Sequence, residues 1–107
     1  MTDKVVVLVT CGSAKEARRI ARAVIEERLA ACVNIIGARV ESIYRWKGRV
    51  ESAKEFLLVM KTLRGRLPLL QRKIMELHSY DVPEIIALPI VAGSREYLAW
   101  LAESIRS

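Results

Sequence analysis

The chain has 107 residues, of which 52% are hydrophobic and 28% charged, and its 18 basic and 12 acidic side chains give a formal net charge of +6. This length predicts a single domain over residues 1–107. No apolar run reaches the roughly 18 residues of a membrane-spanning helix, and Val5 to Val9 is too short for the apolar part of a secretory signal. We therefore expect a cytoplasmic protein without a membrane partner.

The first part of the chain predicts a strand followed by a helix. Val5 to Val9 is a run of β-branched and apolar residues, which is typical of a strand buried on both faces. Ser13 followed three residues later by Glu16 is a capping-box pattern. Apolar residues then recur at helical spacing, so a helix is predicted from Ser13 to about Ala30.

A long hairpin is predicted next. Residues 32–46 and 49–63 both have extended patterns, and Lys47-Gly48 between them allows a tight reversal. Each arm would be about 50 Å long at about 3.4 Å per residue, whereas a chain of this size has an expected radius of gyration of about 13 Å. The hairpin must therefore bend or project from the body. Its outer half still carries Tyr44 and Trp46, which indicates an oligomer interface.

The last third of the chain predicts a helix, an edge strand and a final helix. The helix runs from Pro68 to about His78, and the strand from Glu84 to Val91 contains Pro89, which is tolerated at a sheet edge. A short helix follows Gly93-Ser94. The order β-α-β-β-α-β plus a C-terminal helix predicts an α+β fold, a ferredoxin-like split βαβ sandwich.

The two cysteines are predicted to lie at opposite ends of the sheet. Cys11 closes the first strand and Cys32 opens the second, about 25 Å apart along the intervening helix, whereas a disulfide requires Cα atoms within about 7 Å. We therefore expect no intrachain disulfide. Cys32 is interpreted as a small buried residue. Cys11 would follow a strand and precede a helix N-terminus, which lowers a thiol pKa, so it is a candidate soft-metal ligand.

Several function classes lack their sequence signals. One histidine and two distant cysteines cannot complete a tetrahedral metal site within one chain. Neither a G-x-S-x-G elbow nor a phosphate-binding P-loop motif is present, so we do not expect an enzyme. The two central strands carry one aromatic residue, Phe56, so we expect no nucleic-acid partner despite the basic charge.

Five motifs occur in chain order: ACVNI at 31–35, S-I-Y-x-W-x-G at 42–48, KT at 61–62, H-x-Y-x-x-P-E at 78–84 and Y-L-x-W at 97–100. Together they span essentially the whole chain and resemble the divalent-cation-tolerance (CutA) family. The resemblance implies a ferredoxin-like fold, a tight homotrimer and a likeness to PII-type signalling trimers. It also implies a role in tolerance to copper and other divalent metals.

The resemblance leads to a hypothesis about the site. We expect clefts between subunits to hold Tyr44, Trp46, Lys61, His78, Tyr80 and Glu84. There His78, matched to the family motif, would weakly ligate a divalent metal ion, with copper as the candidate. Glu84 or Cys11 would supply a second ligand.

Other interpretations of these residues remain open. His78 lies at the edge of the second helix's apolar stripe, so it is also interpreted as a buried, hydrogen-bonded histidine. Asp81 fits a turn, and Glu84 could hold Lys61 or a backbone N–H. The competing function is a PII-like signalling module that binds an anionic metabolite or an unknown protein partner. A trimeric scaffold without a small ligand is a third possibility.

Overall fold

A computed structural model describes residues 2–106. The strands are β1 (Lys4–Cys11), β2 (Cys32–Ile35), β3 (Val40–Trp46), β4 (Arg49–Leu63) and β5 (Ile85–Pro89). The helices are α1 (Ala14–Glu26), α2 (Leu67–Leu77) and α3 (Arg95–Arg106), and a 3₁₀ turn at Arg64–Arg66 precedes α2. The element order confirms the predicted α+β fold.

The strands form one antiparallel sheet in the order β2-β4-β1-β5, with β3 pairing to the outer half of β4. The first and last strands are thus neighbours, and β5 lies at an edge, as the split βαβ topology predicts. Pro89, which cannot donate a backbone hydrogen bond, ends this edge strand.

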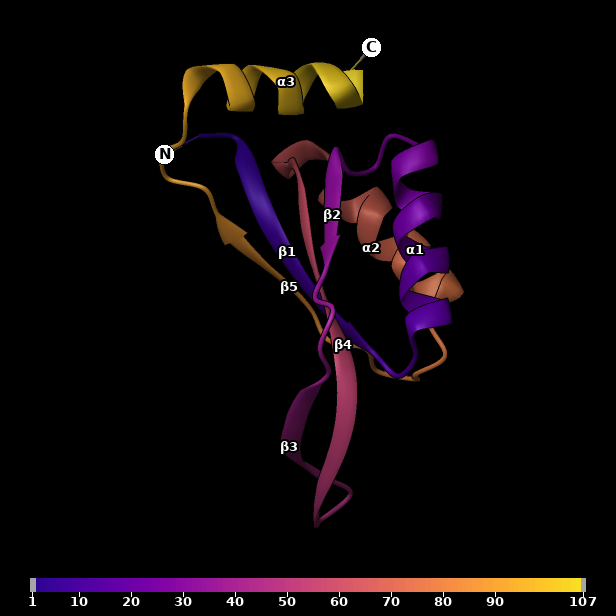
Figure 1. The fold of residues 1–107 in the computed structure, drawn as a ribbon. Helices are drawn as coiled ribbons and strands as arrows, with labels where there is room; N and C mark the ends of the chain where they lie inside the picture. The colour runs from indigo at the N-terminus through magenta and orange to yellow at the C-terminus, as the bar shows by residue number, and fades with distance from the viewer. Residues whose placement is uncertain (1, 107) are drawn as a thin grey trace.

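The core lies between the sheet and two helices. Figure 1 shows α1 and α2 on the same side of the sheet, with α3 across its end. Alternate residues of β1 point to the helices, and Val7 and Val9 are fully buried there with Ile20 of α1 and Ile74 of α2. A smaller cluster forms where α3 meets the sheet. Within residues 2–106 there is no helix with the length and apolar character needed to cross a membrane.

The first helix ends earlier than predicted. It stops at Glu26 rather than near Ala30. Arg28 adopts a left-handed backbone with φ of 57°, and the N–H of Leu29 bonds back to the carbonyl of Val24 at 2.9 Å. This closing turn usually contains glycine, so the sequence lacked the usual signal for it.

The hairpin projects from the body (Figure 1). Projection was one of the two outcomes predicted from its length, the other being a sharp bend. The molecule measures 44 × 25 × 25 Å, and its radius of gyration is 14.3 Å. Lys47 and Gly48 both have positive φ, 51° and 79°, as a two-residue type I′ turn requires.

The first arm of the hairpin is interrupted, whereas a continuous extended segment was predicted. Ile35 pairs with Leu58, and the next pair along is Val40 with Glu55. From Ile35 to Val40 the first arm advances five residues, whereas the second arm advances only three between Leu58 and Glu55. The two extra residues of the first arm bulge out between β2 and β3. At this break the hairpin leaves the main sheet.

Candidate functional site

An open groove of about 640 Å³ lies beside the hairpin. Its walls come from the hairpin, the end of β1 and the loop before β5. The lining residues are Thr10, Ser42, Ile43, Tyr44, Trp46, Glu55, Tyr80, Asp81, Val82 and Glu84. Three of them are acidic and none is basic, although the chain has a net charge of +6. The groove therefore favours cations over anions.

The floor of the groove contains a buried carboxylate bonded to a phenol. Glu55 is only 6% exposed, and the hydroxyl of Tyr80 donates a hydrogen bond of 2.8 Å to its Oε2. Burial and the adjacent Glu55 raise the pKa of Tyr80, so this phenol stays protonated. A Cβ added at Gly12 would lie 3.3 Å from the Tyr80 hydroxyl, so glycine there makes room for this contact.

His78 lies behind the groove wall. Its side chain is fully buried, its Nε2 lies 2.7 Å from the carbonyl oxygen of Thr10, and its Nδ1 accepts the N–H of Tyr80 at 3.1 Å. These bonds assign the neutral imidazole with its proton on Nε2. Both ring nitrogens are therefore engaged, which matches the alternative interpretation of a buried, hydrogen-bonded histidine.

Glu16 supports the same corner from α1. Its Oε2 accepts the N–H of Ser79 at 2.7 Å and lies 3.9 Å from Nδ1 of His78. Its own N–H donates to Ser13 Oγ at 3.1 Å, as the capping-box pattern predicts. Burial would raise the pKa of Glu16, but the hydrogen bonds from Ser79 outweigh it and hold the pKa below the usual value.

The structure corrects the interpretation of Cys11. Its side chain is fully buried on the helix-facing side of β1, and its thiol donates to the carbonyl of Ser13. Burial, with the negative charges of Glu16 and Glu55, raises the pKa of Cys11 to about 11. The predicted lowering by the helix N-terminus is therefore wrong, because desolvation and two carboxylates outweigh it.

Lys61 and Cys32 lie together, away from the groove. Lys61 is six residues beyond Glu55 on β4, or roughly 20 Å along the strand. Its ammonium contacts the side chain of Asn34 and lies 3.9 Å from Cys32 Sγ. Cys32 is only partly buried, rather than buried as predicted, and both cysteines are free thiols, as expected.

The structure thus brings four of the predicted site residues into one groove: Tyr44, Trp46, Tyr80 and Glu84. His78 touches this groove only through Thr10 and Tyr80, while Cys11 and Lys61 do not line it. Sequence reasoning missed Glu55, the buried acid on the floor. That the groove is a cleft between subunits stays a prediction.

A closed metal site requires several ligand side chains close together. Within residues 2–106, no three His, Cys, Asp or Glu side chains lie close enough together to hold a metal ion. Asp81 and Glu84 are both exposed at the rim and supply the oxygen ligands that hard divalent cations prefer. One chain therefore fits open, partly hydrated binding and does not fit a closed site.

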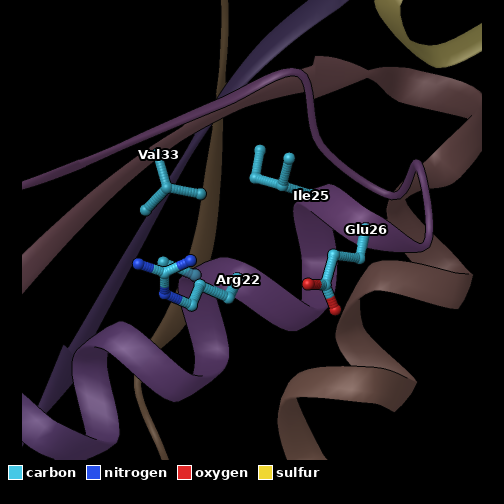
Figure 2. Close-up of a pocket in the computed structure, with 5 residues that line it drawn as sticks. Arg22, Ile25, Glu26 and Val33 are labelled. Atoms are coloured by element: carbon cyan, nitrogen blue, oxygen red, sulfur yellow. The ribbon is translucent and has the colours of Figure 1, made fainter.

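A second, smaller hollow lies between α1 and β2. It measures about 220 Å³ and is lined by Ala21, Arg22, Ile25, Glu26 and Val33. Figure 2 shows Ile25 of the helix and Val33 of the strand beside this hollow, with the charged ends of Arg22 and Glu26 along the helix. With a single acidic side chain, this hollow lacks the ligands for a cation site.

Comparisons with known proteins agree with the fold. Residues 5–104 match the family model described as CutA1 divalent ion tolerance protein. A relative in Thermus thermophilus, "Divalent-cation tolerance protein CutA", is 54% identical over 99 residues, or 92% of this chain and 95% of the relative. "Protein CutA, chloroplastic" of Arabidopsis thaliana is 45% identical over 96% of this chain, which spans 56% of that relative's length.

Solved structures of this family have the same fold as this chain. The structure described as "Divalent cation tolerance protein (Cut A1)", also from Thermus thermophilus, superposes with a TM-score of 0.92 at 52% identity. The alignment covers 94% of this chain and 97% of that one.

Proposed function

Because the chain belongs to the CutA1 divalent ion tolerance family, we propose that it binds a divalent metal ion weakly at the rim of the groove. The observation that carries this proposal is the acidic lining of the groove in a basic chain. Asp81 and Glu84 are exposed there, and none of the lining residues is basic. Their carboxylates would hold a partly hydrated ion.

Copper is the ion we propose first. For a given set of nitrogen, oxygen or sulfur ligands, Cu²⁺ generally binds more tightly than the other divalent ions of the first transition row. An anionic metabolite, the competing hypothesis, would find no basic side chain among the groove's lining residues. The geometry therefore favours the metal hypothesis over the PII-like module.

His78 and Cys11 remain candidate ligands in the proposal, but each would have to give up a favourable interaction to bind a metal ion. His78 would reach an ion through Nδ1 only by giving up the N–H of Tyr80. Cys11 would have to lose its proton against a raised pKa and expose a buried sulfur. Glu84 has neither obstacle, so we propose it as the anchoring ligand.

Calorimetric titration with Cu²⁺ tests the metal site. Glu84→Gln, which keeps the shape of the side chain and removes its charge, is expected to weaken binding by about tenfold or more. Glu96→Gln, on the exposed start of α3, is the matched control and should bind like the wild type. Equal affinity for Glu84→Gln and the wild type contradicts the rim site, and unchanged affinity for His78→Gln removes His78 from the ligand set.

We propose a homotrimer because a single chain leaves apolar surface exposed. On the hairpin, Ile43 and Val50 are 71% and 68% exposed, and α1 and α2 cover only one face of the sheet. Exposed apolar surface of this kind marks protein interfaces. Light scattering on the eluting protein should give three times the chain mass of 12.1 kDa, whereas a monomer would contradict the assembly.

A further inference from the structure

Glu55 is a buried carboxylate to which residues 2–106 supply no counter-charge. None of the ion pairs formed within residues 2–106 includes Glu55, and its hydrogen-bond partner is the neutral Tyr80 hydroxyl. Glu16, buried to the same degree, has the guanidinium of Arg19 at 4.0 Å. Buried charges in proteins are normally paired, so the floor of the groove lacks a positive group.

Three aromatic residues line the same groove as Glu55. Tyr44, Trp46 and Tyr80 line the groove, and aromatic faces attract ammonium groups within about 6 Å of the ring centre. The Trp46 ring already has such a neighbour, since the ammonium of Lys47 lies 5.8 Å from its centroid. A volume of about 640 Å³ lies within the range of roughly 300–1,000 Å³ typical of organic ligands, and a metal ion would leave most of it unfilled.

The groove combines charged and apolar side chains. The buried acid, Glu55, lies at the floor, the aromatic rings lie on the walls, and Asp81 and Glu84 are exposed at the rim. A matching ligand would carry separated positive groups joined by apolar carbon. Metal ions lack the carbon, and simple hydrophobic ligands lack the charge.

We infer that the groove binds an aliphatic polyamine. One ammonium group pairs with Glu55, the methylene chain lies against Tyr44 and Trp46, and the remaining ammonium groups pair with Asp81 and Glu84. The inference goes beyond the proposed metal function, because it depends on the buried acid and the aromatic walls. The metal proposal depends on the rim carboxylates alone.

Calorimetric titration of the purified, assembled protein with spermidine tests the inference. Glu55→Gln keeps the hydrogen bond from Tyr80 and removes the charge, while Trp46→Leu keeps an apolar side chain and removes the ring. Each variant is expected to bind spermidine about tenfold more weakly. Glu96→Gln and Trp100→Leu are matched controls on α3, outside the groove, and should bind like the wild type.

Three further measurements make the result decisive. Hexane-1,6-diol, which has methylene groups without charge, should not bind. Mg²⁺ at equal ionic strength competes only for Asp81 and Glu84, so it should not displace spermidine fully. Thermal unfolding of each variant shows whether it is folded. Wild-type affinity in a folded Glu55→Gln or Trp46→Leu variant, or full displacement of spermidine by Mg²⁺, overturns the inference.

The two proposals fail separately. Copper binding that depends on Glu84, without spermidine binding, overturns only the polyamine inference. Spermidine binding that depends on Glu55 and Trp46, without copper binding, overturns only the metal function.

Discussion

The Nε2 atom of His78 lies 2.7 Å from the carbonyl oxygen of Thr10, so the imidazole joins the end of α2 to the end of β1. Its other nitrogen accepts the N–H of Tyr80, the residue that bonds to Glu55 on the floor of the groove. His78 thus holds the groove wall in place.

Replacing His78 should therefore cost stability. His78→Ala removes one buried and one partly buried hydrogen bond and leaves a cavity, so we expect a loss of about 2–4 kcal/mol in the free energy of unfolding. Guanidinium chloride unfolding measures it. Asp81→Ala, an exposed position three residues on, is the control and should change stability by less than about 0.5 kcal/mol. A His78→Ala protein as stable as the wild type would contradict this structural role.

Tyr80→Phe tests the floor of the groove. Without the hydroxyl, the buried Glu55 loses its hydrogen-bond donor, which should cost about 1–3 kcal/mol. Combining it with Glu55→Gln should recover part of the loss, because an uncharged amide is easier to bury than a carboxylate. Chemical unfolding of the three variants measures the coupling. Additive effects of the two substitutions would argue against it.

Acid should unfold the protein partly through Glu16. Its pKa in the folded state is below the usual value of 4.5, so the unfolded chain takes up this proton first as the pH falls. The stability that Glu16 contributes is present above pH 4.5 and is lost as the pH falls through the folded-state pKa. Thermal melts of Glu16→Gln between about pH 7 and pH 3 should show a weaker acid dependence than the wild type. Parallel curves would contradict the prediction.

The two thiols should react at very different rates. Cys11 is fully buried with its pKa raised to about 11, whereas Cys32 is only partly buried. Because the thiolate is the reactive form, iodoacetamide at about pH 8 should alkylate Cys32 first and leave Cys11 intact in the folded protein. Peptide mass spectrometry reads both sites. In denaturant the difference between the two alkylation rates should disappear. Early labelling of Cys11 in the native protein would contradict the burial of its thiol.

Glycine is required at one hairpin position and not at another. Gly48 has a φ of 79°, so Gly48→Ala should lower the free energy of unfolding by about 1 kcal/mol. At Gly37, where φ is not left-handed and an added Cβ meets nothing within 4 Å, alanine should have little effect. Comparing the unfolding midpoints of the two variants tests the turn. Equal midpoints would contradict it.

Much of the fold could be predicted because periodicity and turn chemistry are local. The Lys47-Gly48 reversal and the apolar stripes of α1 and α2 were read correctly from neighbouring residues. The end of α1 could not be, because Arg28 takes the left-handed conformation that glycine usually marks. The bulge between β2 and β3 depends on pairing with β4, which is not local.

The groove could be predicted only in part, because its residues are brought together by pairing and packing that are not local. Tyr44 and Trp46 were recognised as exposed aromatics on a hairpin. Once the turn is set at Lys47-Gly48, Tyr44 pairs with Glu51 and Val40 with Glu55, so counting outward from the turn would have placed Glu55 on their face. The burial of Cys11 depends on packing by α1, and its pKa could not be inferred from its position after a strand.

β4 runs unbroken from the hairpin turn into the core, so the projecting arm and the buried sheet share one alternation of side chains. A single residue added to each arm below Tyr44 would turn Tyr44 and Trp46 to the opposite face from Glu55, whereas two residues would restore the original facing. The length of the arm can therefore change only in even steps if the groove is to survive. Evolution and protein engineers alike would have to extend or shorten this hairpin two residues per arm at a time.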